Sequence, residues 1–183
     1  MGYKPQLKVG EKIFHFGEAR NHNMSQVTDE YDWIIWLDAD DVFRGREKLK
    51  KVVEFMHDKG IEAGFFNYLY QVEFDNDGNM QVVIEHLRER VVKRGLYHWV
   101  APIHETLIEK KPTVKQDIAD CDVLHLSNDE RRNSALGRNI RALENAIYLN
   151  KGEDPRTVYY LAKALVDLAR FKDLDNNYHQ PGS

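Results

Sequence analysis

Five consecutive apolar residues followed at once by a run of aspartates constrain this chain more than any other feature. The apolar residues are 33–37 (Trp-Ile-Ile-Trp-Leu), and the acidic run is Asp38-Ala39-Asp40-Asp41. A strand that is apolar on both faces is typical of the interior of an α/β sheet, where helices cover the two faces. The pattern therefore predicts a central strand over residues 32–37. It places the aspartates at the carboxyl end of that strand, where ligands bind in open α/β sheets.

The acidic run is expected to need a partner, because three carboxylates within four residues repel one another unless a cation or hydrogen-bond donors compensate them. In an extended backbone, residues i and i+2 point to the same side, so Asp38 and Asp40 are expected to address one site. Such carboxylates favour a divalent ion, Mg²⁺ or Mn²⁺, with a phosphate as a further ligand. The alternative is a polar turn in which the aspartates, Asp41 in particular, cap the next helix.

Composition excludes several classes of protein. The 183 residues are 42% hydrophobic, which is enough apolar material for a core, and 26 basic against 30 acidic residues (net −4) argue against a nucleic-acid surface. The sequence has no apolar run near the ~20 residues that span a bilayer, and no secretory signal. A single cysteine, Cys121, excludes an internal disulfide and fits a reducing compartment. We therefore expect a cytoplasmic protein without a membrane span or a nucleic-acid partner.

Local patterns predict the other elements of an α/β fold. Strands are expected at 12–16, 63–74, 80–84, 86–94 and 122–126, weak helical character at 18–28, and an amphipathic helix at 46–60. The Asn-Asp-Gly-Asn sequence at 76–79 predicts a hairpin turn, since Gly and Asn tolerate positive φ.

The texture of the sequence changes after about residue 126. Helices are expected at 131–149 and 158–171, with Asp154 as N-cap and Pro155 at the first helical position of the second. The predicted organisation is therefore an α/β domain over residues 1–126 and a helical hairpin with a tail over residues 127–183.

Several motifs in order along the chain carry a family resemblance. The sequence Phe16-Gly-Glu-Ala-Arg-Asn, followed by residues 32–40, resembles the family 2 glycosyltransferases of the GT-A fold. Residues 97–105 (Tyr-His-Trp-Val-Ala-Pro-Ile-His-Glu) are similar to a Trp-x-x-Pro-x-His-Glu stretch of one bacterial subgroup, and residues 88–90 and 122–126 resemble two of its strands. The resemblance implies a partial GT-A, Rossmann-like sheet followed by tetratricopeptide-like helices.

The resemblance also implies roles for individual residues. Asp40 is expected to bind the metal, with Asp38 and His125 as further ligands, and Asp38 also reaching the ribose or a metal-bound water. Arg20, Asn21 and Trp99 are expected on the donor side. The alternative for His125 is a core position, and the alternative for Arg20 and Asn21 is a salt bridge at a helix N-terminus. A solvated strand face is expected for the basic residues, with a phosphate clamp as the alternative; these residues are Arg88, Arg90, Lys93 and Arg94.

Residues 104 and 105 are candidates for proton transfer. Glu105 fits as the general base that takes a proton from the acceptor nucleophile, and His104 could do the same near pH 7. Because neighbours on a strand point apart, only one of them is expected to face the substrate. A surface His-Glu pair is the alternative.

The implied reaction is transfer of a hexose-type sugar from a nucleotide-diphosphate-sugar, with a UDP-sugar favoured, to an unknown acceptor, with Mn²⁺ or Mg²⁺. Only twelve residues precede Ile13, whereas one βαβ unit needs about 30. The nucleotide-binding front of the domain is therefore expected to be missing or supplied elsewhere, through a truncated sequence, a split gene or a prophage-like remnant.

Two other function classes stay open. One is a non-catalytic glycosyltransferase remnant that acts as a protein-interaction module, and the other is a metal-dependent phosphohydrolase or nucleotidyltransferase. A sheet that lacks its first strands leaves an apolar edge, so a homodimer or a complementing chain is expected along that edge.

Overall fold

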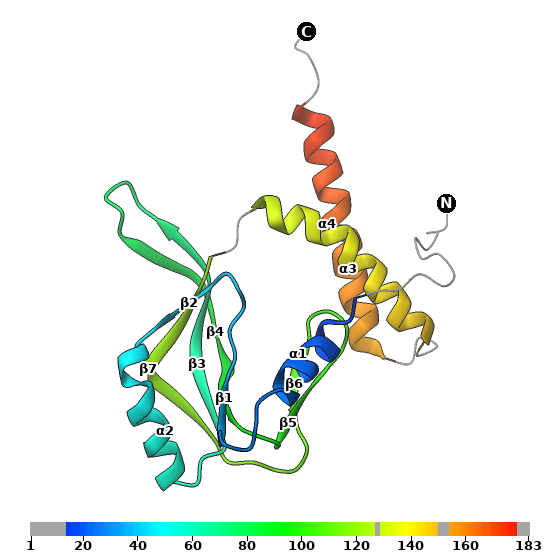
Figure 1. Cartoon of the computed structure of the whole chain (residues 1–183). Coiled ribbons are helices and arrows are strands. Elements are labelled where there is room, and N and C mark those ends of the chain that lie inside the picture. The colour runs from blue at the N-terminus through cyan, green and yellow to red at the C-terminus, as the bar shows by residue number, and fades with distance from the viewer. Residues whose placement is uncertain (1–13, 127–128, 150–153, 179–183) are drawn as a thin grey trace. The chain divides into compact units, whose positions relative to one another are not determined.

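The computed structural model describes residues 14–126, 129–149 and 154–178 (Figure 1). The chain divides into two compact units. One unit holds Met1–Arg20, Val100–Thr106 and Asn128–Ser183, and the other holds Asn21–Trp99 and Leu107–Ser127. The boundary predicted after residue 126 was based on a change in sequence pattern, whereas the two units are defined by contacts in the structure. The predicted boundary stays a prediction.

The second unit is built on a mixed five-stranded sheet, which confirms the predicted α/β class. Its strands are β1 (Trp33–Ile35), β2 (Asp41–Arg44), β3 (Ala63–Phe74), β4 (Met80–Lys93) and β7 (Lys115–His125), in the order β1-β4-β3-β7-β2. The β3–β7 pair is parallel and the other three pairs are antiparallel.

The prediction of a central strand over residues 32–37 is wrong. The strand that forms there, β1, has three residues and lies at the edge of the sheet, where it pairs with β4 alone among the described strands. Ile34 is buried, but Ile35 and Leu37 are 37% and 39% exposed. Ile35 and Leu37 alternate with the buried Ile34, so the apolar run was not a sign that both faces of this strand are covered.

The β3–β4 hairpin was predicted closely, except that the segments 80–84 and 86–94 form one continuous strand. Asp75 closes the turn by accepting hydrogen bonds from the backbone N–H groups of Asp77 and Asn79, and Gly78 has the expected positive φ of 79°. In Figure 1 the tip of this hairpin projects away from the rest of the sheet.

The predicted amphipathic helix is confirmed as a 3₁₀ turn, η1 (Arg46–Lys48), followed by α2 (Leu49–Asp58). Val52 and Met56 on its apolar side pack against Phe66 of β3 in one core cluster. A second cluster holds Ile34, Val92 and Trp99. It involves a two-stranded sheet that the sequence patterns did not reveal, made of β5 (Tyr97–Val100) and β6 (Thr106–Glu109).

The first unit is mainly helical. Helices α3 (Asp129–Leu149) and α4 (Pro155–Tyr178) confirm the predicted hairpin, and their shared core includes Ile140, Leu143 and Ala164 together with Ile103. Their tetratricopeptide-like character stays a prediction. Within the described ranges, no helix is long and apolar enough to cross a membrane.

Helix α1 (Phe16–Ser25) begins in the first unit, continues into the second, and replaces the strand predicted over residues 12–16. That prediction is wrong for residues 14–16, and residues 12 and 13 lie outside the described part. Phe16 is instead the first residue of α1, and its backbone N–H donates to the carbonyl of Pro102 at 3.0 Å.

Candidate metal and catalytic site

The aspartates that follow β1 form a turn and not an extended segment. The backbone N–H of Asp41 donates to the carbonyl of Asp38 at 3.0 Å, and the backbone N–H of Asp38 donates to Asp41 Oδ2 at 3.0 Å. The expectation that Asp38 and Asp40 share a face through strand alternation is therefore wrong. The turn sends the chain directly into β2, which begins at Asp41.

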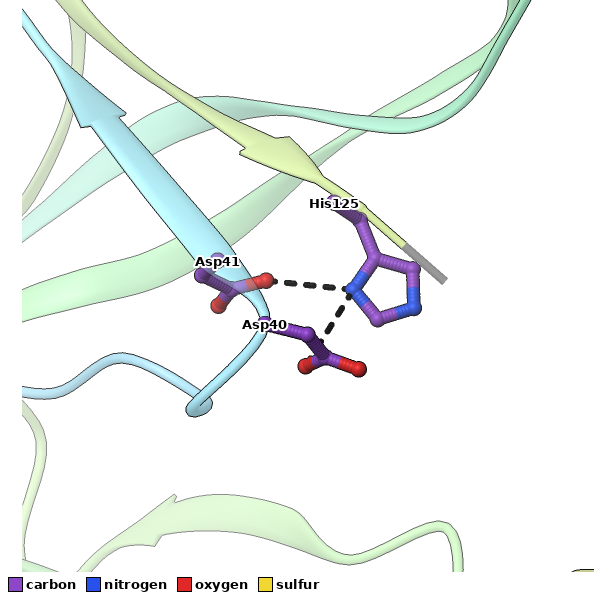
Figure 2. Close-up of side chains that lie close together, drawn as sticks. All are labelled: Asp40, Asp41 and His125. Atoms are coloured by element: carbon purple, nitrogen blue, oxygen red, sulfur yellow. Dashed lines mark hydrogen bonds and ion pairs between the residues drawn. The ribbon is translucent and has the colours of Figure 1, made fainter. Parts of the chain in front are cut away.

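Pairing of β2 with β7 brings the acidic run to a histidine 84 residues away. Asp41 is the register partner of His125, and the backbone N–H of Leu126 donates to the carbonyl of Asp40 at 2.9 Å. His125 Nδ1 lies 3.2 Å from Asp41 Oδ1 and 3.8 Å from Asp40 Oδ1 (Figure 2). Asp40, Asp41 and His125 each place one ligand atom within 4.8 Å of the others, as a metal site requires.

The three members of this group differ in how much of their side chain is open to a ligand. The side chains of Asp40 and His125 are 25% and 14% exposed, whereas that of Asp41 is fully buried. Asp41 Oδ1 faces Tyr68 Oη and His125 Nδ1, each at 3.2 Å, and Asp41 Oδ2 faces Arg90 Nη1 and the N–H of Asp38, each at 3.0 Å. A carboxylate offers about four lone-pair directions, so Asp41 is already saturated.

The role of Asp41 is therefore to hold the neighbouring side chains in place. Burial by itself raises the pKa of Asp41, but hydrogen bonds from His125 and from the Asp38 N–H, together with the charge of Arg90, outweigh it and leave the pKa of this carboxyl below its usual value. An ionised Asp41 that faces His125 Nδ1 orients the imidazole, as carboxylates do beside metal-binding histidines. Asp41 does not cap α2, which was the alternative role expected from the sequence.

Arg90 lies in the interior of this unit, so its assignment to a solvated strand face is wrong. The guanidinium carbon lies 4.0 Å from the centroid of the Trp36 ring and 4.3 Å from that of Tyr68, and the side chain is 1% exposed. Burial lowers the pKa of Arg90, and the negative charge of Asp41 opposes that shift. Burial and the charge of Asp41 raise the pKa of Tyr68, which therefore stays protonated and can donate to Asp41.

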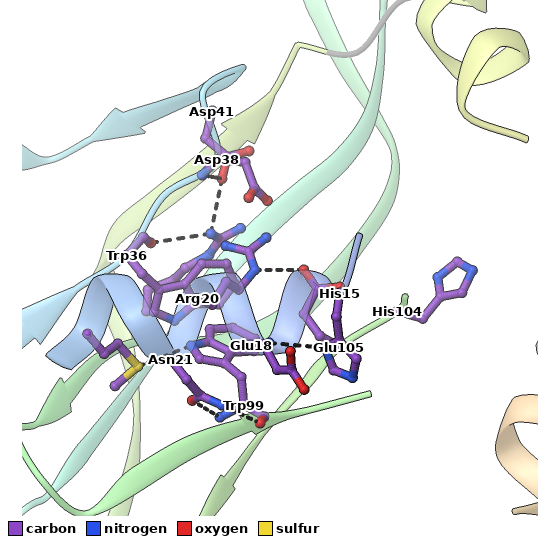
Figure 3. A network of polar contacts seen from close by, with 12 residues as sticks. His15, Glu18, Arg20, Asn21, Trp36, Asp38, Asp41, Trp99, His104 and Glu105 are labelled. Atoms are coloured by element: carbon purple, nitrogen blue, oxygen red, sulfur yellow. Dashed lines mark hydrogen bonds and ion pairs between the residues drawn. The ribbon is translucent and has the colours of Figure 1, made fainter. Parts of the chain in front are cut away.

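The predicted proton-transfer residues lie in the other compact unit. Arg20 Nε donates to Glu105 Oε1 at 2.6 Å, and the two side chains are 21% and 14% exposed (Figure 3). The His104 ring stacks on Tyr160 of α4 with centroids 4.0 Å apart, and Arg156 donates to the His104 carbonyl at 2.8 Å. The Glu105–Arg20 pair is thus an ordered contact between distant parts of the sequence.

The loop that carries these residues is strained. Ala101 and His104 have φ values of 73° and 53°, a conformation that side chains other than glycine adopt at a cost. Burial lowers the pKa of His104, which leaves its imidazole neutral at pH 7.

Asn21 and Trp99 form two hydrogen bonds with each other. The Asn21 amide donates to the Trp99 carbonyl at 2.9 Å and accepts from the Trp99 N–H at 2.7 Å (Figure 3). Trp99 is 3% exposed, and its ring meets Trp36 edge to face. This burial does not support the predicted stacking of Trp99 on a sugar.

The residues Asp40, Asp41 and His125 are called the metal-type group below. Sequence reasoning missed four residues around it. Tyr68, Tyr70 and His86 lie beside His125 or one ring away from it, and Arg90 holds Asp41. The available signal was the i, i+2 spacing of His86 and Arg88 on β4, which places both on one face of the strand. The β3–β4 register shifts at Tyr70 and at Arg90, so alternation alone did not place these two residues.

A comparison with protein families gives a match over most of the chain. The family model described as glycosyl transferase family 2 matches residues 3–121, which include β1, the aspartate turn and most of β7. The chain belongs to glycosyl transferase family 2. Members of this family transfer a sugar from a nucleotide-sugar to an acceptor, and the mixed sheet with its following helices is consistent with a partial GT-A fold. A search of curated proteins finds no significant match.

In this member of glycosyl transferase family 2, the metal-type group Asp40–Asp41–His125 and the pair Glu105–Arg20 belong to different units. Asp38 is not a member of the metal-type group, although its backbone shapes the turn. The role predicted for Asp38 as a ligand stays a prediction.

Proposed function

We propose that this glycosyltransferase moves a sugar from a nucleoside diphosphate donor, a UDP-sugar first among them, to an acceptor, and that Asp40 and His125 hold a divalent cation for this reaction. The observation that carries the proposal is that β2–β7 pairing brings Asp40, which follows β1, beside His125.

The ligand atoms that Asp40 and His125 offer fit a divalent cation such as Mg²⁺ or Mn²⁺. Asp40 supplies carboxylate oxygens and His125 an imidazole nitrogen, and both side chains are partly exposed. Carboxylates suit both Mg²⁺ and Mn²⁺, whereas the nitrogen favours Mn²⁺. When bound, the cation would neutralise charge on the departing diphosphate. We include Asp38 on the donor side, toward the ribose or a cation-bound water.

Glu105 is the proposed base. Its ion pair with Arg20 holds the carboxylate in one orientation, and a carboxylate so held can take the proton of the acceptor nucleophile as that atom attacks the anomeric carbon. His104 is the alternative base, since its imidazole is neutral at pH 7. Arg20 and Asn21 are proposed to lie on the donor side. Substitution of Glu105 by Gln should abolish release of nucleoside diphosphate while donor binding stays.

The test of the whole proposal is the melting temperature of the full chain with Mn²⁺ and a panel of nucleotide-sugars. We expect a stabilisation that needs both metal and one donor, is lost in Asp40→Ala and His125→Ala, and is kept in the control Asp58→Ala, which lies exposed at the end of α2. No shift with any donor would favour a non-catalytic interaction module. Release of phosphate from simple nucleotides would favour a phosphohydrolase.

We also propose that a strand of a second copy or of another chain pairs along the edge of β1 that no strand in the described part of the chain covers. Ile35 and Leu37, 37% and 39% exposed, are the apolar residues next to that edge, and open apolar edges are usually covered. Sedimentation of the chain alone tests the homodimer. A monomer at about 100 µM would exclude it, since stable dimers have dissociation constants well below this concentration.

A further inference from the structure

The ring of Tyr70 lies flat against the imidazole of His125. The two ring centroids are 5.5 Å apart and the planes differ by only 5°. Tyr70 is 39% exposed and therefore does not belong to the core. An aromatic ring that is partly open to solvent, yet parallel to a histidine of the metal-type group, calls for an explanation other than burial.

The backbone of β3 is irregular at this residue. The register with β4 runs from Leu69–Glu85 to Gln71–Ile84, so Tyr70 has no partner on β4. An extra residue of this kind is a β-bulge, which re-aims a side chain and is frequent beside active sites. Here the bulge directs Tyr70 toward the end of β7, where His125 is the last residue of the strand.

The imidazole of His86 also packs against the Tyr70 ring. The His86 ring lies 5.8 Å from Tyr70 at an angle of 51°, and 5.3 Å from Tyr68. Tyr68 in turn faces Asp41 through its hydroxyl. Each ring therefore limits the rotation of its neighbour, and the row extends from β4 across β3 to β7.

Three side chains surround the His125 imidazole: Asp41 at its edge, and Tyr68 and Tyr70 with ring centroids 5.6 and 5.5 Å away. The Tyr68 ring is tilted by 54° to the imidazole, whereas the Tyr70 ring is parallel to it. Asp41 contacts the edge of the imidazole at Nδ1, which sets its rotation within the ring plane, and Tyr70 contacts its face, which sets the orientation of that plane. We propose that Tyr70 is a positioning residue for His125 as a metal ligand, an inference that rests on the metal site of the proposed function. Removal of the flat face frees the imidazole to rotate, and the metal site loses preorganisation.

The experiment is a titration of the full chain with Mn²⁺ alone, in which electron paramagnetic resonance measures the free ion. We expect Tyr70→Ala to weaken Mn²⁺ binding about tenfold, the lower end of the effect of residues that orient metal ligands. Tyr70→Phe keeps the flat face and should bind within about twofold of the unsubstituted chain. Phe74→Ala removes an aromatic residue that is 60% exposed on the same strand and is the matched control.

A second readout does not depend on the metal. The ring protons of His125 should show an upfield ring-current shift in NMR spectra, kept in Tyr70→Phe and lost in Tyr70→Ala. If Tyr70→Ala does not fold, Tyr70→Leu keeps the bulk without the flat face and carries the same expectations. Unchanged Mn²⁺ affinity in the alanine or leucine variant overturns the inference alone. Failure of the unsubstituted chain to bind Mn²⁺ overturns the metal site of the proposed function together with it.

Discussion

Substitution of Arg90 by Met tests whether the buried cation holds the aspartate turn in place. Arg90 Nη1 lies 3.0 Å from Asp41 Oδ2, and neither side chain is more than 1% exposed. Methionine keeps most of the apolar contact with Trp36 and Tyr68 but removes the charge. The variant therefore isolates the cost of leaving Asp41 buried without its cation.

The expected magnitude follows from what remains around Asp41. Breaking a buried ion pair by removing one partner costs about 3–5 kcal/mol. Tyr68, His125 and the Asp38 N–H still face the carboxylate, which favours the lower end, about 3 kcal/mol of unfolding free energy. For a chain of this size that corresponds to a fall in melting temperature of about 6–12 °C.

Urea unfolding followed by tryptophan fluorescence is the suitable assay. The chain has three tryptophans, Trp33, Trp36 and Trp99, and all lie in the unit that contains Arg90. Arg88→Met is the matched control, because Arg88 is half-buried on the same strand, and its guanidinium lies farther from the Trp36 ring, at 5.9 Å.

A double-mutant cycle adds a second criterion. Combined with Asp41→Asn, the loss caused by Arg90→Met should shrink by about 2 kcal/mol, since no buried carboxylate then remains unpaired. A loss below about 1 kcal/mol in Arg90→Met, equal to that in Arg88→Met, would refute the view that this cation compensates Asp41.

Two further predictions concern backbone strain and pH. Gly45→Ala should destabilise the chain by clearly more than the about 1–2 kcal/mol that a left-handed alanine costs, because its Cβ would lie 2.6 Å from the Asp120 carbonyl oxygen. Gly78→Ala, with a similar φ and open space around it, should cost only this conformational amount. Equal losses of unfolding free energy in urea would contradict the clash. Burial lowers the pKa of His104 below its unfolded value near 6.5, so the unfolded chain binds more protons and stability should fall as the pH drops from about 7 to 5. His104→Asn tolerates the positive φ and should flatten the pH dependence of the melting temperature, with a residual slope from His86, whose pKa burial and the charges of Arg88 and Arg90 also lower.

Local sequence patterns predicted the elements that local physics determines. The spacing of Val52 and Met56 predicted α2, the Asn-Asp-Gly-Asn turn predicted the β3–β4 hairpin, and Asp154 with Pro155 predicted the start of α4. Each of these signals depends on residues within a few positions of one another. The same is true of the apolar run and its aspartates, which pointed to the correct family.

Tertiary structure alone decided which side chains meet. Pairing of β2 with β7 joins Asp40 to His125, and the bulge at Tyr70 turns its ring onto that histidine, because strand register depends on contacts between segments far apart in sequence. Burial of Arg90 likewise follows from its pairing with Asp41, since a basic residue on a strand carries no sign of its partner. Periodicity in the sequence reports which face of an element is covered, and the choice of covering partner is made only when the whole chain packs.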